Sequence, residues 1–291
     1  MARVVCVHGI GQQLKGEDSL AGEWKPALRD GLRRAGCAEE QLPTDGELRC
    51  VFYGDVFRPA GRRLGVGDPW LTAADATGFD QELLMAWWRG AAESDPRVVH
   101  PDARTLAGTP GSVQMALRAL SGSPFFAGLA DRVKLFDLQQ VRRYMTDPKV
   151  RRDVQDRVVA EVGDDARVMV GHSLGSVVAY EALCAHPEWP VRALVTLGSP
   201  LGIRNLIFDR LVPRPVAGDS GRPLGAWPGA VESWVNVADA GDVVALVKDL
   251  RPLFGARVGC HLVANGSHAH DVKPYLTAAE TGAAIVGGLG T

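Results

Sequence analysis

The chain has 291 residues, of which 46% are hydrophobic and 23% charged, and its formal net charge is −2. This size and composition are ordinary for a globular protein with one large domain, and the charge gives no reason to expect nucleic acid or an anionic membrane as a partner. The five cysteines form no CxxC pair, and no apolar run is long enough to span a membrane. A cytoplasmic enzyme with reduced cysteines is the simplest interpretation.

An apolar strand opens the chain at Arg3 and ends in the sequence His8-Gly9-Ile10-Gly11. Apolar residues then recur at helical spacing from Ser19 to Ala35, and Leu48 to Tyr53 has the pattern of a second strand. A strand, a helix and a strand in this order predict a right-handed parallel crossover.

Regular alternation is lost over residues 54–130, where glycine, proline and aspartate are frequent. Two amphipathic pieces interrupt this segment, Phe79 to Ala92 and Val113 to Leu120. A segment of this length is too long for a plain loop inside a compact domain. It is therefore predicted to be a cap or lid inserted after the second strand.

The rest of the chain alternates helices with strands. A helical stretch from Val133 to Val162 is broken near Asp147-Pro148, and a Pro- and Gly-rich excursion covers residues 201–230. The other expected elements are the strands Val168–Val170, Val191–Ser199, Ser233–Val237 and Arg257–Val263, and the helices that begin at Val177, Val243 and Pro274 and end near Leu183, Leu250 and Gly287. This order predicts a single α/β domain over residues 1–291, with a doubly wound, mostly parallel sheet of about six strands.

The third strand leads into Gly171-His172-Ser173-Leu174-Gly175, and a helix follows at once. A G-x-S-x-G sequence between a strand and a helix is typical of a nucleophilic serine on a sharp turn. Ser173 is therefore the expected nucleophile. The N–H of Leu174, at the start of the helix, is the first expected donor to an oxyanion.

A serine hydroxyl needs a base and an orienting acid, and a parallel sheet brings such groups together at the carboxyl ends of its strands. His268 and His270 follow the last strand, and His270 is preferred because it lies further from the strand. Asp239 and Asp242 follow the preceding strand, and Asp242 is preferred at the start of an expected helix, where it can also act as an N-cap.

A second oxyanion donor is expected from the glycine-containing loop after the first strand. The N–H of Ile10 is the preferred donor and that of Gly11 is the alternative. His8 and His172 lie next to the two motifs and are expected to orient backbone loops through hydrogen bonds.

Aromatic residues in the 54–130 segment are more frequent than a solvated loop requires. Most are expected to form a small core of the cap, and at least one should line an acyl pocket above Ser173. The candidates for substrate binding are Trp87, Trp88 and Phe125.

The chain order Ser173, Asp242, His270 resembles that of the α/β-hydrolase superfamily. The loop Val7–Gly11 is similar to the oxyanion loop of bacterial lipases and esterases, and Gly171–Gly175 to their nucleophile turn. The resemblance implies a hydrolase core, but with no residues before the first strand it would lack the first two of eight strands.

The resemblance implies a serine hydrolase that cleaves a carboxylic ester or thioester with a hydrophobic acyl group through a Ser-His-Asp triad. An amidase, peptidase or acyltransferase would use the same machinery, and a hydrolase-fold module that binds a partner or ligand is the other alternative. No metal-binding cluster or phosphate-binding glycine loop occurs in the sequence, so no metal and no cofactor are expected. The sequence predicts a small-molecule or acyl substrate and leaves the oligomeric state open.

Overall fold

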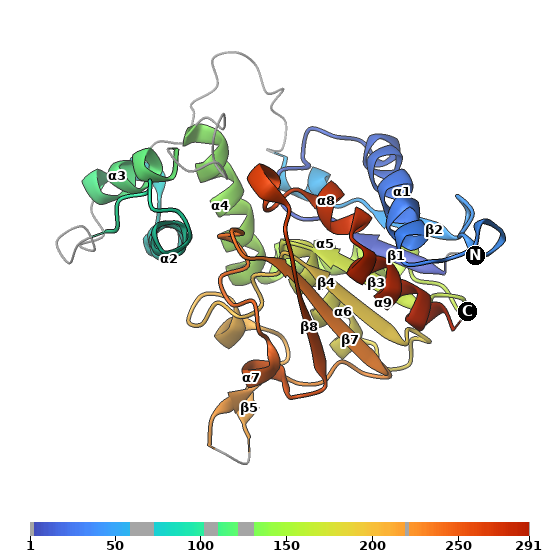
Figure 1. Ribbon diagram of the computed structural model, residues 1–291. Coiled ribbons are helices and arrows are strands. Elements are labelled where there is room, and N and C mark those ends of the chain that lie inside the picture. The colour runs from blue at the N-terminus through green and yellow to red at the C-terminus, as the bar shows by residue number, and fades with distance from the viewer. Residues whose placement is uncertain (1–2, 59–72, 102–109, 122–130, 219–220, 291) are drawn as a thin grey trace.

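The computed structural model describes residues 3–58, 73–101, 110–121, 131–218 and 221–290. Its main sheet has six strands, all parallel, in the order β2-β1-β3-β4-β7-β8 (Figure 1). These are β1 (Val4–Val7), β2 (Leu48–Val51), β3 (Val168–His172), β4 (Ala193–Leu197), β7 (Ser233–Asp239) and β8 (Val258–Val263). A separate antiparallel hairpin consists of β5 (Val216–Ala217) and β6 (Pro223–Leu224). The predicted α/β class and the six-stranded sheet are confirmed.

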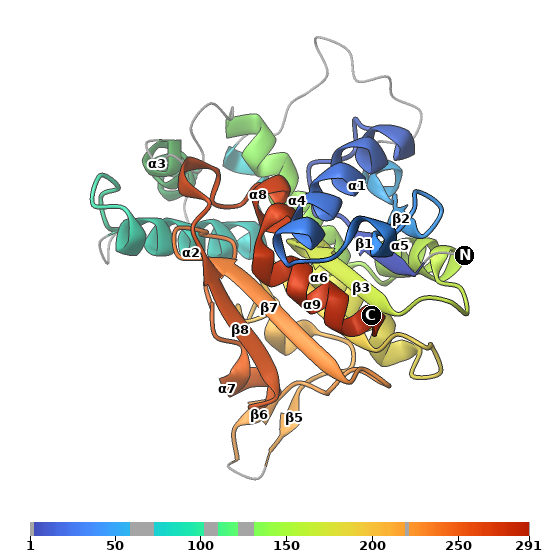
Figure 2. The ribbon, with the colours of Figure 1, turned by 45° about the vertical axis from the view of Figure 1, so that its right-hand side comes forward.

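Helices cover both faces of the sheet. One face carries α1 (Glu17–Arg34), α8 (Val272–Thr277) and α9 (Ala279–Leu289), and Figure 2 shows α8 and α9 crossing the sheet in front of β3 and β7. The other face carries α5 (Pro148–Glu161) and α6 (Leu174–Ala185). The strands are buried on both sides, which explains their nearly continuous apolar sequences.

Successive residues of each central strand contribute to opposite faces. In β1, Val4 belongs to the apolar cluster under α1 and Val5 to the cluster under α6. In β3, Val168 and Met169 divide in the same way. This alternation follows from the two-residue period of a β-strand.

The strand order reverses direction at β1. The chain leaves β1 through α1 toward β2, whereas it leaves β3 through α6 toward β4, on the other face of the sheet. Diverging connections of this kind leave a crevice beyond the carboxyl ends of the two strands, which is where open α/β sheets bind ligands. The register pairs Val7 with Gly171, so His8 and His172 follow at this crevice.

Three described α-helices lie between β2 and α5: α2 (Gly78–Ser94), α3 (Pro110–Ser121) and α4 (Asp131–Thr146). Figure 1 shows α2 and α3 as a pair outside the two helical layers. Leu83 of α2 and Val113 of α3 belong to the same apolar cluster as Met169 of the sheet, so they share its core. The predicted break at Asp147-Pro148 separates α4 from α5, where the Asp147 carboxylate caps α5 by accepting the Lys149 N–H at 2.8 Å.

The helix predicted from Val243 to Leu250 is wrong. This segment is an irregular loop, and the only short helix near it is α7 (Arg251–Phe254) within the described residues. Side chains take the place of the helical ladder: Asn236 Nδ2 donates to the Lys248 carbonyl at 3.0 Å, and Lys248 Nζ donates to the Asp242 carbonyl. Because side chains satisfy these two carbonyls, they do not need helical hydrogen bonds.

The single closing helix predicted from Pro274 to Gly287 is also wrong, because α8 and α9 are separated at Ala278. Ala278 has extended backbone angles, φ −67° and ψ 139°, and Thr281 Oγ1 donates to the Tyr275 carbonyl at 2.7 Å. Short 3₁₀ turns lie at Glu39–Gln41, Gly54–Phe57, Ala73–Asp75, Phe208–Arg210 and Gly266–His268.

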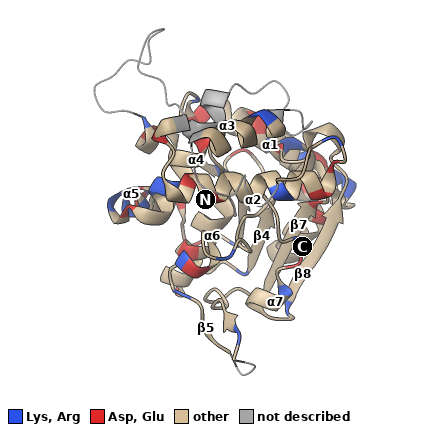
Figure 3. Ribbon diagram, turned by 90° about the vertical axis from the view of Figure 1, so that its left-hand side faces the viewer, with Lys and Arg blue, Asp and Glu red and all other residues tan. Residues whose placement is uncertain are grey.

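Acidic and basic positions alternate along the exposed helices, as Figure 3 shows for α5. On α5, Lys149 pairs with Asp153 at 2.6 Å, and Arg157 pairs with Asp55 at 2.7 Å. These are solvated ion pairs and not a basic surface. None of the described helices has both the length and the apolar character needed to cross a bilayer.

We expect Gly175→Ala to destabilise the fold by about 3 kcal/mol or more, because the added methyl group would collide with the carbonyl oxygens of Val7 and His8. The matched control is Gly22→Ala in α1, where an added Cβ meets no atom within 4 Å. Alanine there should stabilise the helix by about 0.5–1 kcal/mol. Urea denaturation measures both changes, and equal effects would contradict the close approach of α6 to the loop after β1.

Candidate active site

Ser173 lies on the turn between β3 and α6 with a backbone conformation that only few residues adopt. Its φ is 53° and its ψ is −129°, although it is not a glycine. The Ser173 N–H donates to the Leu197 carbonyl at 3.0 Å, which fixes the turn to the end of β4. Strained, non-glycine turns of this kind occur mainly at functional sites.

The Ser173 hydroxyl, the His270 ring and the Asp242 carboxylate form one chain of hydrogen bonds. Ser173 Oγ lies 2.9 Å from His270 Nε2, and His270 Nδ1 lies 2.8 Å from Asp242 Oδ2. A carboxylate only accepts, so Nδ1 carries the proton and Nε2 is left to accept the serine proton. The structure thus brings together the three residues that the sequence favours, in a geometry suited to activating a hydroxyl group.

Asp242 is fully buried and firmly held. Its Oδ1 accepts the N–H groups of Val244 at 2.9 Å and Ala245 at 3.2 Å, and its Oδ2 also accepts the Tyr275 hydroxyl at 2.8 Å. The Oδ1 bonds have the pattern of an N-cap, although no helix follows. Burial opposes ionisation of Asp242, but His270 and the Tyr275 hydroxyl together hold its pKa below the ordinary value.

The alternative acid and base have other partners. His268 is exposed and its Nδ1 pairs with Asp271 at 2.8 Å. Asp239 accepts the N–H of Gly241 at 2.7 Å and the N–H of Asn265, so it joins the loops that follow β7 and β8. In the described structure neither residue contacts the Ser173 hydroxyl.

Both expected oxyanion donors lie beside Ser173. Leu174 is the first residue of α6, where N–H groups have no acceptor within the helix. The other loop reaches the serine through Gly9, since a Cβ on Gly9 would lie only 2.7 Å from Ser173 Cβ. Ile10 follows directly and lines the same cavity as Ser173.

His8 holds the loop that carries Ile10. The Tyr53 N–H donates to His8 Nε2 at 3.2 Å, so His8 Nδ1 carries the proton and donates to the Gly9 carbonyl. The His8 ring also stacks on the Tyr53 ring at 3.9 Å. Burial lowers the pKa of His8 to about 4, which keeps the ring neutral at neutral pH.

His172 holds the loop that carries His270. Its Nε2 donates to the His270 carbonyl at 2.8 Å, and the two rings lie 4.7 Å apart. Burial and the neighbouring His270 lower the pKa of His172 to about 3. Both histidines next to the motifs therefore position backbone, as expected from the sequence.

Two further residues complete the site, and sequence reasoning assigned a role to neither. Tyr275 links the acid to its loop: its hydroxyl donates to Asp242 and accepts the Asp239 N–H at 2.8 Å. Gly198 ends β4 with φ 53°, and a Cβ there would lie 2.7 Å from Asp242 Oδ2 and 3.1 Å from His270 Nδ1. A glycine directly after an apolar strand was the available signal for this close approach.

A cavity of about 480 Å³ opens above Ser173, a size typical of small-molecule sites. Its lining is mostly apolar surface, with several charged groups among the apolar ones. The side chains that line it include Ile10, Lys15, Glu23, Trp24, Trp87, Asp137, Val244, Asp271, Val272 and Lys273.

The three aromatic residues predicted to bind substrate differ in their positions in the structure. Trp87 of α2 lines the cavity. Trp88 is instead buried in the core, and its indole N–H donates to the Val99 carbonyl at 2.7 Å, so the structure does not place it in the site. Phe125 lies outside the described residues.

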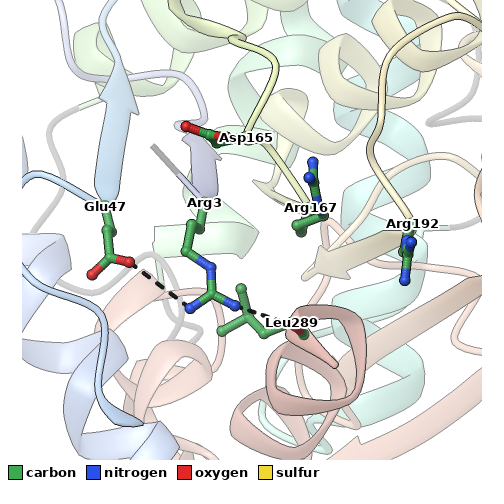
Figure 4. Close-up of a pocket in the computed structure, with 6 residues that line it drawn as sticks. All are labelled: Arg3, Glu47, Asp165, Arg167, Arg192 and Leu289. Carbon is green, nitrogen blue, oxygen red and sulfur yellow. Dashed lines mark hydrogen bonds and ion pairs between the residues drawn. The ribbon is translucent and has the colours of Figure 1, made fainter. Parts of the chain in front are cut away.

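A second cavity, of about 340 Å³, lies at the amino ends of the strands (Figure 4). It contains three arginines, but their guanidinium groups do not converge and are already engaged. Arg3 donates to the Leu289 carbonyl at 3.2 Å, and Arg167 donates to the carbonyls of Asp164 and Ala166 at 3.0 Å. Its lining contains no serine, cysteine or histidine, so the candidate active site is the cavity at the other edge of the sheet.

Within the described ranges, no group of three or more His, Cys, Asp or Glu side chains is arranged to hold a metal ion. No protein-family model and no curated protein sequence matches the chain. A functional assignment therefore depends on the geometry of the site.

Acid should destabilise the protein through His8 and His172. Their folded pKa values of about 4 and about 3 lie below the ordinary 6.5, so the unfolded chain takes up protons that the folded chain does not. Stability present above pH 6.5 is therefore lost as the pH falls. We expect these two residues to lower the free energy of unfolding by about 4 kcal/mol between pH 7 and pH 5.

Urea denaturation at pH 7, 6 and 5 measures this fall. His172→Asn should remove about half of it. His261→Asn, at an exposed position, controls for the loss of a histidine. A urea midpoint that does not change over this range would contradict the buried, neutral state of the two rings.

Proposed function

We propose that the protein is a serine hydrolase of the α/β-hydrolase type that cleaves a carboxylic ester or thioester through an acyl-enzyme. The observation that supports this most strongly is the chain of hydrogen bonds from Ser173 Oγ through His270 to Asp242. A binding module does not need a serine on a strained backbone whose hydroxyl group is aligned with a base and faces a cavity.

In the first half-reaction, Ser173 Oγ attacks the carbonyl carbon of the substrate while His270 Nε2 takes its proton. The negative charge on the carbonyl oxygen meets the N–H groups of Leu174 and Ile10, at the amino end of α6. Asp242 remains ionised and stabilises the imidazolium that forms. His270 then gives the proton to the departing alcohol or thiol, and the acyl group stays on Ser173.

In the second half-reaction, His270 Nε2 takes a proton from water, which attacks the acyl-enzyme carbonyl. The same two N–H groups stabilise the second oxyanion, and the proton returns to Ser173 Oγ as the acid leaves. Every group used in these steps belongs to the chain, so the proposal invokes no cofactor.

The topology supports the hydrolase type. The nucleophile follows β3, the acid follows β7 and the base follows β8, so the chain order is Ser, Asp, His. The oxyanion loop follows β1, the neighbour of β3 in the sheet. We interpret the fold as a hydrolase core without its first two strands, with α2 and α3 as the described part of a cap within residues 54–130.

The cavity supports a small acyl compound as substrate. Trp87 offers an apolar surface for the acyl chain, together with Ile10 and Val244. Amidases, peptidases and acyltransferases would use the same triad, and the ester or thioester is favoured by the resemblance to lipases and esterases.

We expect Ser173→Ala to lower kcat for p-nitrophenyl esters by about 10³-fold or more, because the nucleophile is lost. The same variant should not be labelled by a fluorophosphonate probe that labels the wild type. Its thermal unfolding should remain cooperative. Near-normal turnover by this variant would remove Ser173 from the mechanism, and an unlabelled, inactive wild type would favour the binding module.

The base and the acid each have a matched control in the chain. His270→Ala should be nearly as damaging as Ser173→Ala, whereas His268→Ala should cost much less. Asp242→Asn should lower kcat by misorienting the imidazole, by up to about 10⁴-fold, and Asp239→Asn should not. A reversed order within either pair would assign the role to the other residue.

We expect Trp87 to determine which acyl-chain length the enzyme prefers. The matched control is Trp88, which is buried to nearly the same extent but does not line the cavity. Trp87→Phe enlarges the cavity, so kcat/KM for longer acyl chains should rise several-fold relative to acetate, since one methylene contributes about 1–3 kcal/mol in an apolar pocket. Trp88→Phe should leave the profile of p-nitrophenyl esters unchanged while lowering stability. Unchanged profiles in both variants would mean that α2 does not contact the acyl group.

A further inference from the structure

One charged group in the cavity has no role in the proposed reaction. Asp137 of α4 lines the same cavity as Ser173 and His270. Its carboxylate lies against the oxyanion loop, because its two oxygens are 3.7 and 3.8 Å from the position of a Cβ added to Gly11. It is therefore next to the place where negative charge would develop during the reaction.

The Asp137 carboxyl group is held in place but has no cationic partner among the described residues. Gln140 Nε2 donates to its Oδ1 at 3.3 Å and also to Gln13 Oε1 at 3.1 Å, which ties α4 to the loop after β1. Among the described residues, Gln140 provides the only hydrogen bond to this carboxyl group, and no cationic side chain pairs with it. Burial raises the pKa of Asp137 to about 7, against the opposing influence of His270.

The other charged side chains around the cavity are either paired or exposed to solvent. Lys15 and Glu23 form an ion pair at 2.5 Å, and Asp271 pairs with His268 at 2.8 Å. Lys273 is exposed to solvent on α8. Asp137 is thus the charged residue of the lining that is neither paired with an opposite charge nor fully exposed to solvent.

A partly buried carboxylate without a cation is unfavourable, and here it also opposes the oxyanion. A positively charged group on the substrate would relieve both effects. Trp87 lines the same cavity, and an indole ring attracts a cation over its face in addition to packing against methylene groups.

We propose that Asp137 determines the specificity of this site and that the substrate is an ester or thioester carrying a positively charged nitrogen, which binds the Asp137 carboxylate. This inference rests on the proposed hydrolase function and adds the charge class of the substrate. Asp137 binds the substrate and takes no part in the proton transfers.

The test compares pairs of substrates that differ in charge but hardly in shape. On the acyl side, the pair is the p-nitrophenyl esters of 4-(trimethylammonio)butanoate and 5,5-dimethylhexanoate. On the alcohol side, it is the thioacetates of 2-(trimethylammonio)ethanethiol and 3,3-dimethylbutanethiol. The quantity measured is the ratio of kcat/KM for the charged ester to that for the neutral ester, at pH 8.

For the wild type, we expect this ratio to exceed about tenfold in at least one pair, and Asp137→Asn should lower it at least tenfold. Turnover of the neutral esters should rise in this variant, because the charge that opposes the oxyanion is removed, and cooperative thermal unfolding shows that the variant folds. Asp271→Asn, which removes a paired carboxylate from the same cavity, should leave the ratio unchanged.

The outcomes separate the two proposals. Ratios near one in both pairs, with good turnover of the neutral esters, would overturn the assignment of Asp137 and leave the hydrolase function standing. A high wild-type ratio that persists in Asp137→Asn would also overturn it. Failure of the wild type to hydrolyse any of the four esters, without labelling by a fluorophosphonate, would overturn both.

Discussion

The site depends on the strained backbone of Ser173, which is possible only because α6 and the first loop approach each other very closely. A non-glycine residue at φ 53° is costly, and the cost is offset by contacts that fix both sides of the turn. The Ser173 N–H is bound to the end of β4, and Gly175 lets α6 pack onto the carbonyl oxygens at the end of β1. The contacts that pack the central strands therefore also hold the Ser173 hydroxyl group in position.

Two buried, neutral histidines fix the positions of the loops on either side of Ser173. His8 ties the oxyanion loop to Tyr53, and His172 ties the loop of His270 to the nucleophile turn. Each ring is buried with its N–H donated to a carbonyl oxygen, so protonation would leave a buried charge. The positions of His270 and of the loop after β1 therefore depend on the two histidines that are expected to make the fold sensitive to acid.

The features that could be predicted from the sequence are those that depend on a local sequence pattern or on the parallel order of the strands. Ser173 follows from a strand, a glycine turn and a helix, and His270 from the rule that the strands of a parallel sheet end at one edge. The helix expected at residues 243–250 was wrong because side chains from β7 and from the loop itself satisfy its carbonyls. Trp88 and Asp137 were beyond sequence reasoning, because which face of a helix meets the cavity depends on tertiary packing.

Asp137 and the expected oxyanion donors have opposite electrostatic effects on negative charge in the same part of the cavity. The N–H groups at the start of α6 favour negative charge, whereas a carboxylate beside Gly11 disfavours it. In a partly enclosed site both effects are stronger than in water, since the effective dielectric constant is lower. In the proposed mechanism, a cation on the substrate that binds between the carboxylate and the oxyanion would attract both of them. The site would then discriminate by charge at the step where charge develops, and a neutral substrate of the same shape would lack that advantage.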